Sequence, residues 1–181
     1  MINLTLNRRK LLKTLGLTAG TALLKLPASA TDNSIKASPA FKYSLNMSTI
    51  RGQNLGFIKE LEIASKAGFR SVEIWIDTFQ TYLQNGGSTA EAKRIVDGLG
   101  LEIENAIGFA KWIVDDDGTR GAGLSQLQNE MELLAQIGCK RIAAPPMGAN
   151  SINAPIIDLN IITERYLSSL KMGEQTGVMP M

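Results

Sequence analysis

The side chains that could do chemistry in this sequence are mainly carboxylates, because its 181 residues include no histidine and one cysteine. A histidine-based nucleophile relay, a histidine metal site and a thiolate metal cluster are therefore excluded within these residues. Three glutamates alternate with apolar residues in β-favouring runs: Glu73, Glu102 and Glu104. An unpaired carboxylate in a buried strand is costly, so each of them needs a ligand, a partner charge or solvent.

Two interpretations of Glu73 remain open. Its side chain either points into the fold and binds a substrate or a metal-bound water, or is neutralised by a lysine or arginine from a neighbouring strand. Glu102 and Glu104 share one face of their strand. We expect at least one of these two to be a solvated or paired structural charge, and Glu104 is also a candidate for substrate contact.

Three aromatic residues lie at or just beyond the ends of predicted strands: Trp75, Phe109 and Trp112. Aromatic side chains at such positions commonly line ligand pockets. The alternative is that they close the hydrophobic core, and this alternative is favoured for Phe109. Trp112 follows Lys111 in a predicted loop and is the better candidate for a pocket wall.

These residues belong to an alternation of short β-favouring runs and amphipathic helical runs. Strands are predicted over 41–47, 71–75, 101–106 and 141–144, and from 178 onward. Two helices are predicted over 55–66 and 88–99. A third helix is predicted to end at about residue 137, and a fourth to begin at residue 158. Ser88 or Thr89 is expected to cap the second helix and Asp158 the fourth.

A glycine follows each predicted helix and precedes the next strand: Gly68, Gly100, Gly138 and Gly177. Glycine tolerates the left-handed conformation that ends a helix and turns the chain back into a sheet. Repeated βα units give parallel sheets, either an open doubly wound sheet or a (β/α)8 barrel. No glycine-rich nucleotide-binding motif follows a strand, which favours the barrel.

A (β/α)8 TIM barrel typically takes about 250 residues. The sequence therefore predicts an α/β barrel truncated to about four βα units plus the start of a fifth strand. The abrupt ending after Val178 is interpreted as a stop within a structural unit. The predicted domains are a signal peptide over 1–30, a linker over 31–40 and the first part of the barrel over 41–181.

The first 30 residues combine a basic segment, a modestly apolar run and an Ala-Ser-Ala end, as a secretory signal requires. Arg8 and Arg9, followed by Lys10 and two leucines, resemble the twin-arginine signal family. That resemblance implies recognition by the twin-arginine translocase and export of a folded bacterial protein to the periplasm. The apolar run is short and interrupted by Lys25, so a stable membrane anchor is not expected.

The formal net charge of +2 comes from this leader. Five of the 19 lysines and arginines precede residue 30, where no acidic residue lies. The rest of the chain carries 14 basic and 17 acidic residues, a formal charge of about −3. A nucleic acid partner is therefore not expected.

Two runs resemble the xylose-isomerase-like TIM barrel family, the sugar phosphate isomerases and epimerases: K-A-G-F-R-S-V-E-I-W from Lys66 and I-G-C-K-R-I-A-A-P-P-M-G from Ile137. The resemblance implies a site at the C-terminal ends of the strands and a small-molecule sugar or sugar derivative as ligand. It also implies a divalent metal (Mn, Mg, Co or Zn), held in the family by residues of the fifth to eighth strands. No position here matches those ligands, so this chain is expected to bind no metal and to be inactive by itself.

Two other functions remain open beside an exported isomerase or epimerase. One is a non-catalytic, exported sugar-binding barrel. The other is a half-barrel that pairs with another half, since its open sheet edges would favour self-association. A DNA-repair endonuclease on the same fold conflicts with export and with the acidic charge.

Overall fold

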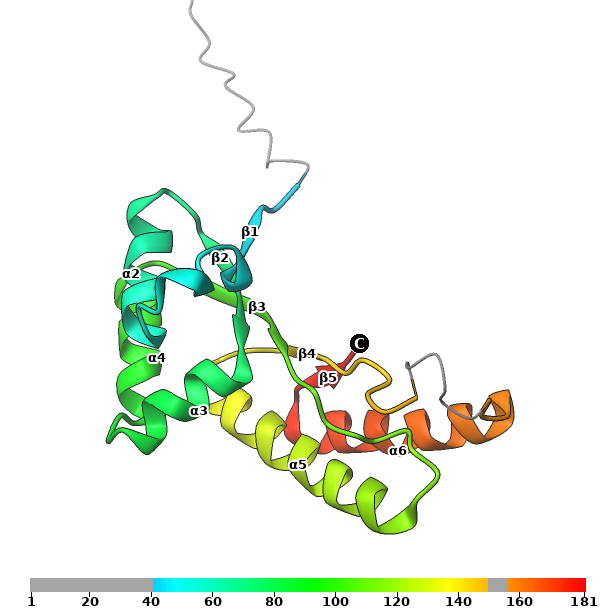
Figure 1. The fold of residues 1–181 in the computed structure, drawn as a ribbon. Helices are drawn as coiled ribbons and strands as arrows, with labels where there is room; N and C mark the ends of the chain where they lie inside the picture. Colours follow the sequence, from blue (N-terminus) through cyan, green and yellow to red (C-terminus); the bar gives the residue numbers. More distant parts are fainter. Residues whose placement is uncertain (1–40, 150–155) are drawn as a thin grey trace, which may run out of the picture. The chain divides into compact units, whose positions relative to one another are not determined.

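Five short strands run parallel and pair in the order of the sequence in the computed structural model, which describes residues 41–149 and 156–181 (Figure 1). The strands are β1 (Ser44–Asn46), β2 (Ser71–Trp75), β3 (Glu102–Ile107), β4 (Arg141–Ala143) and β5 (Met179–Pro180). Each strand except the first hydrogen-bonds to the strand before it in parallel register. Sequential parallel pairing is the arrangement of a barrel wall, as the repeated βα pattern predicts.

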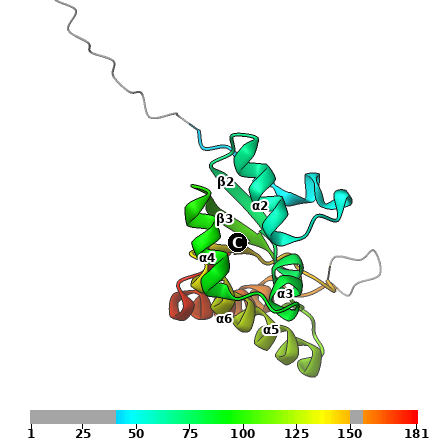
Figure 2. The same cartoon turned by 90° about the vertical axis from the view of Figure 1, so that its left-hand side faces the viewer.

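Helices separate the successive strands (Figures 1 and 2). They are α2 (Phe57–Lys66), α3 (Ile76–Gln84), α4 (Thr89–Gly98), α5 (Asp117–Gln136) and α6 (Leu159–Thr176), with two 3-10 turns, η1 (Met47–Thr49) and η2 (Arg51–Gln53). Helices α4, α5 and α6 pack in succession, and α6 also contacts β5. The helices thus form a layer along one face of the sheet.

The predicted glycine turns are confirmed. Gly68, Gly100, Gly138 and Gly177 have φ angles of 93°, 64°, 83° and 75°, all in the region that favours glycine. The predicted caps are confirmed as well: the Ser88 side chain accepts a hydrogen bond from the Glu91 backbone N–H at 3.1 Å. Asp158 does the same for Asn160 at 2.8 Å.

Helix α3 was not expected from the sequence. It begins directly after β2, without the glycine or proline that usually marks a turn. Ile76 and Phe79 are one helical turn apart and are 3% and 0% exposed, and the Phe79 ring lies 4.9 Å from that of Phe57. Tertiary burial of these two side chains therefore accounts for a helix that local propensity did not indicate.

The hydrophobic core lies between the sheet and the helices. On the strands it includes Val72, Ile74, Ile103, Ala106 and Ile142, none more than 5% exposed. The helices contribute Leu61, Val96, Leu127, Met131 and Leu134. Cys139 is fully buried, and burial raises the pKa of its thiol to about 11.

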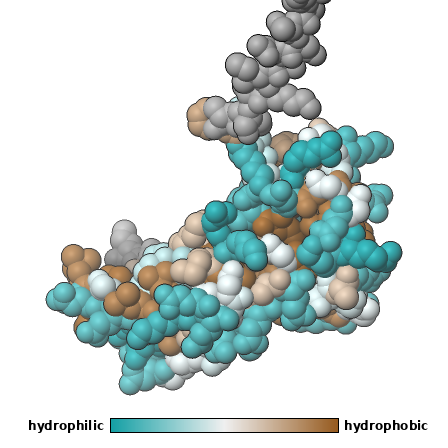
Figure 3. All heavy atoms as spheres, turned by 180° about the vertical axis from the view of Figure 1, so that it is seen from behind, coloured by the Kyte–Doolittle hydropathy of each residue, from teal (hydrophilic) through white to brown (hydrophobic). Residues whose placement is uncertain are grey.

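Much of the surface seen from behind is hydrophilic, and apolar residues gather in two places: over α6 at one end, and in a recessed area of the other half (Figure 3). Leu159, Ile161 and Leu167 of α6 are exposed. No described helix is both long enough and apolar enough to cross a membrane. The predicted leader with Arg8 and Arg9 and the predicted linker over 31–40 lie outside the described residues.

Candidate functional site

A polar cluster occupies the sheet face opposite the helices. Along β2, Val72 and Ile74 are buried in the core, whereas Glu73 and Trp75 alternate with them and are half-buried. Glu73 lines a cavity of about 350 Å³. The remaining residues lining this cavity come from β1, β3, β4 and the end of the chain: Ser44, Glu104, Asn105, Arg141 and Met181.

Glu73 is held by amides from the strands on both sides. The Asn105 side-chain N–H donates to Glu73 Oε1 at 2.6 Å, and the Asn46 side-chain N–H donates to Oε2. These residues are register partners across β1, β2 and β3. The expected alternatives for Glu73 included neutralisation by a lysine or arginine, and the structure shows two neutral donors instead.

A β-bulge brings Asn105 to this position. Val72 pairs with Ile103, but the next residue, Glu73, pairs with Asn105, so Glu104 is one extra residue on β3. Without the bulge, Glu104 would stand opposite Glu73, and like charges directly opposite each other destabilise a sheet. The bulge therefore replaces a carboxylate with an amide at the position facing Glu73.

Glu104 forms a charged network on the same face instead. Lys42 contacts both Glu102 and Glu104, and Arg141 Nη1 lies 3.3 Å from Glu104 Oε2. The hydrogen bond from Lys42 is the main reason that the pKa of Glu104 lies below its ordinary value; burial opposes this shift and Arg141 adds to it. Both glutamates are thus paired charges, in line with the structural interpretation offered for at least one of them.

An aromatic pair stands at the carboxyl end of β2. The rings of Trp75 and Phe109 lie 5.2 Å apart, and the guanidinium of Arg51 lies 4.1 Å from the centre of the Trp75 ring. Phe109 is 37% exposed. This end of the sheet therefore presents an apolar face capped by a cation, an arrangement that suits a ligand with both apolar and polar sides.

Trp112 lies apart from this pair, in the core. It is 5% exposed, and its indole N–H donates to the carbonyl oxygens of Ala144 at 2.9 Å and Pro145 at 3.2 Å. Its ring lies 5.7 Å from that of Tyr166 on α6. The described geometry gives Trp112 the role of joining the segment after β3 to β4 and α6.

The sheet face opposite the helices, here called the inner face, offers few ligands to a divalent metal. Among residues 41–149 and 156–181, no group of three or more metal-ligating side chains lies close enough together to hold an ion. The oxygens of Glu73 already accept amide hydrogens, and Glu104 is paired with Lys42. A divalent cation prefers several free oxygen ligands, so this donor set does not fit one.

Asn46, Asn105 and Arg51 are the residues of this site that the sequence analysis did not single out. Asn46 ends β1 opposite Glu73, and its position at a strand end was an available signal. Asn105 depends on the bulge, which arises from pairing between two strands. Arg51 lies in a 3-10 turn between the predicted strand over 41–47 and the predicted helix over 55–66, a segment to which the sequence analysis assigned no structure.

The fold and the site together define a class of protein. Repeated βα units form a parallel sheet, and a polar cluster lies on the face away from the helices. In a closed sheet of this kind, that face becomes the interior of a barrel. The chain is thus an α/β protein of the TIM-barrel type.

Solved structures narrow this class further. A xylose isomerase domain-containing protein from Salmonella typhimurium LT2 matches with a TM-score of 0.62 and 10% identity, over 77% of this chain and 47% of that one. The IolI protein, solved with a zinc atom bound, matches with a TM-score of 0.60 and 17% identity, over 77% and 50%. A D-psicose 3-epimerase, solved in the presence of D-fructose, matches with a TM-score of 0.56 and 15% identity, over 77% and 51%.

The chain therefore has the fold of the xylose isomerase-like TIM barrels and spans about half the length of these solved structures. This confirms the predicted fold, and it agrees with the prediction that residues 41–181 form the first part of such a barrel. Neither a protein-family model nor a curated protein matches the sequence.

Proposed function

We propose that this chain binds a sugar on the inner face of its sheet and forms part of a sugar isomerase or epimerase. The observation that carries the proposal is the geometry of Glu73, which lines the inner cavity and is held by Asn46 and Asn105. The names of solved structures with the same fold support it, since they include a D-psicose 3-epimerase and a 3-keto-D-glucoside 4-epimerase.

Glu73 is suited to positioning a sugar hydroxyl. A carboxylate has about four lone-pair positions, and two of those on Glu73 accept the amide hydrogens. The remaining positions can accept hydrogen bonds from hydroxyl groups, while the amides hold the carboxylate in one orientation. Trp75 and Phe109 offer an aromatic surface at the end of the same strand for the apolar side of a sugar ring.

Proton transfer is not assigned to any described residue. Isomerisation and epimerisation require a base to remove a proton next to a carbonyl, and a metal that polarises that carbonyl makes the step easier. The carboxylates of the inner face are engaged by amides or cations. We therefore propose that these 181 residues bind the sugar without converting it.

We also propose that the protein is exported from the cytoplasm. Arg8 and Arg9, the apolar run after them and the Ala28-Ser29-Ala30 end support this proposal. Replacing both arginines by lysine should leave the protein in the cytoplasmic fraction of a bacterial host. Its continued appearance in the periplasm would contradict twin-arginine export.

Calorimetric titration of the full chain with D-fructose tests the binding proposal. Glu73→Gln should weaken binding by about ten- to a hundredfold, because one hydrogen bond to a charged group contributes about 1.5–3 kcal/mol. Glu102→Gln is the matched control, since Glu102 lies on β3 but does not line the cavity. Equal weakening by both substitutions, or none by Glu73→Gln, would contradict the role of Glu73.

Assaying the same chain for epimer formation with Mn²⁺ present tests the proposal that it binds the sugar without converting it. We expect bound D-fructose to remain unconverted. Metal-dependent turnover that is lost on adding a chelator would show that the chain is an enzyme by itself.

A further inference from the structure

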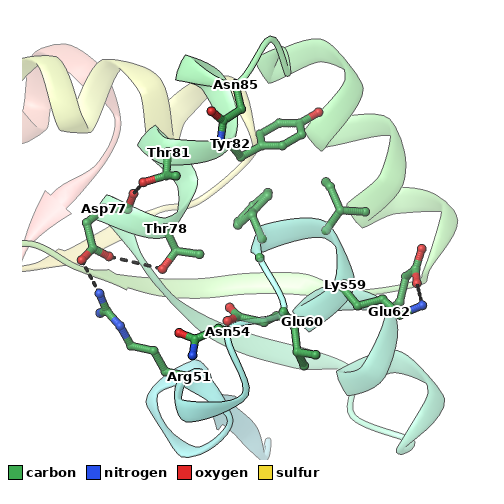
Figure 4. Close-up of a pocket in the computed structure, with 14 residues that line it drawn as sticks. Arg51, Asn54, Lys59, Glu60, Glu62, Asp77, Thr78, Thr81, Tyr82 and Asn85 are labelled. Atoms are coloured by element: carbon green, nitrogen blue, oxygen red, sulfur yellow. Dashed lines mark hydrogen bonds and ion pairs between the residues drawn. The ribbon is translucent and has the colours of Figure 1, made fainter.

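A second cavity lies outside the inner face. Its volume is about 580 Å³, and it lies between η2, the first turns of α2, and α3 (Figure 4). Fourteen residues line it, and none of them lines the inner-face cavity. This cavity is therefore separate from the inner-face cavity, although Arg51 in its lining also lies over the Trp75 ring.

Glu60 is the charged residue buried most deeply in its lining. The residue is 5% exposed and belongs to α2, and its side chain extends toward Asn54 (Figure 4). Burial raises the pKa of the Glu60 carboxyl above its ordinary value, and the positive charge of Arg51 opposes that shift. A buried carboxylate of this kind is costly unless a cation or hydrogen-bond donors compensate it.

The other charged residues around the cavity form ion pairs, although Arg51 Nη1 has no hydrogen-bond partner among the described residues. Arg51 Nη2 lies 2.5 Å from Asp77 Oδ2, and Lys59 Nζ lies 2.7 Å from Glu62 Oε2. Within the part of the chain that the structure describes, no hydrogen bond or ion pair joins the Glu60 carboxylate to another side chain. Among the described residues, Glu60 is thus the one carboxylate of this lining without an ion pair or a side-chain hydrogen bond, although the positive charge of Arg51 acts on it.

The rest of the lining is amphipathic. Leu55, Phe57 and Ile58 supply an apolar wall, and Asn54 and Asn85 supply exposed amides. An anionic ligand would meet an unpaired carboxylate here, and a neutral one would leave that carboxylate uncompensated. A small organic cation with an apolar body matches both the charge and the wall.

We infer that this cavity binds a small primary amine, whose ammonium group pairs with Glu60 and whose apolar body packs against Leu55 and Ile58. An ammonium ion supplies three hydrogen-bond donors and a full positive charge, both of which a buried carboxylate lacks here. Arg51 is shared with the surroundings of the sugar site, because its guanidinium lies over the Trp75 ring, but the inference does not rest on the function proposed for that site.

Titration of the full chain with 2-phenylethylamine tests the inference, and 2-phenylethanol serves as a neutral probe of similar shape. We expect saturable binding of one amine per chain. The alcohol should bind at least about tenfold more weakly, because it lacks the charge. Glu60→Gln keeps the size of the side chain and should weaken amine binding by a similar factor. Glu62→Gln is the matched control, since Glu62 is exposed in the same lining and paired with Lys59.

Three results would overturn the inference: no saturable amine binding, equal binding of amine and alcohol, or equal effects of Glu60→Gln and Glu62→Gln. Circular dichroism establishes whether Glu60→Gln folds. If it does not, Leu55→Trp fills the apolar side of the cavity and leaves Glu60 in place. Amine binding that survives this substitution unchanged would likewise overturn the inference.

Discussion

The side-chain N–H of Asn105 lies 2.6 Å from Glu73 Oε1, and this contact exists because β3 carries one more residue than β2 at that point. The extra residue is Glu104, which turns toward Lys42 and Arg141. A bulge commonly re-aims a side chain next to a functional site. Here it separates two carboxylates that a regular ladder would place opposite each other.

Asn105→Asp should therefore destabilise the protein in a pH-dependent way. At pH 7 it places a second carboxylate against Glu73, and we expect a loss of about 1–3 kcal/mol in the free energy of unfolding. At pH 4 one carboxyl of the pair can hold a proton and donate it to the other, so much of the loss should be recovered. Urea unfolding at the two pH values measures the difference.

Asn105→Ala is the control for this prediction. It removes the donor without adding a charge, so its cost should change much less between pH 7 and pH 4. Equal stability of Asn105→Asp and the unsubstituted chain at pH 7 would show that Glu73 and residue 105 do not interact as described.

Local sequence signals predicted the repeating unit well. The glycine turns at Gly68 and Gly138 and the alternation along 71–75 act over a few residues, so a single sequence reveals them. The bounds of β2 and the cap at Ser88 came out as predicted for the same reason.

Features set by contacts between distant segments were not predicted. The bulge at Glu104 depends on how β3 pairs with β2, and α3 depends on burial of Phe79 against Phe57. Trp112 was expected in a loop that faces a pocket, because its neighbour Lys111 is polar. Its hydrogen bond to the Ala144 carbonyl joins residues 32 positions apart, and no local pattern indicates such a contact.

Glu104→Gln should lower stability at pH 7 but not at low pH. The pKa of Glu104 is held below its ordinary value of 4.5, chiefly by Lys42, so the folded protein binds fewer protons there than the unfolded chain. The stabilisation is present above that value and is lost as the pH falls through the lowered pKa. Urea unfolding at pH 7 and pH 3 tests this, with exposed Glu174 on α6 substituted in the same way as the control. A difference that persists at pH 3 would exclude the ion pair as its cause.

Glu130→Gln, unlike Glu104→Gln, should raise the stability of the protein at pH 7. Glu130 is 1% exposed on α5; its Oε1 accepts a hydrogen bond from Gln126 at 2.8 Å, and its Oε2 is buried without a partner among the described residues. Burial raises the pKa of this carboxyl above its ordinary value of 4.5, and the Gln126 hydrogen bond opposes the shift. The folded protein thus retains a proton that the unfolded chain releases, and stability falls as the pH rises above 4.5.

The substitution removes this dependence, so Glu130→Gln should be more stable than the unsubstituted chain at pH 7 and about equal to it at pH 4. Denaturant unfolding at both pH values is the measurement. Glu132→Gln, at an exposed position two residues further along α5, should show no such gain. A loss of stability at pH 7 for Glu130→Gln would mean that the ionised carboxylate is itself stabilising.

Two glycines of α5 should respond to alanine in opposite directions. A Cβ atom at Gly123 would lie 2.6 Å from the backbone carbonyl carbon and oxygen of Lys111, whereas one at Gly121 would meet nothing within 4 Å. Gly123 thus allows α5 to approach the segment that carries Phe109 and Trp112 beyond β3. Gly121→Ala gains helix propensity and should stabilise the protein by about 0.5–1 kcal/mol. Gly123→Ala forces the helix away from that segment and should cost about 1–3 kcal/mol. Thermal unfolding of the two variants compares them directly, and a stabilising Gly123→Ala would show that the segment after β3 is not fixed against α5.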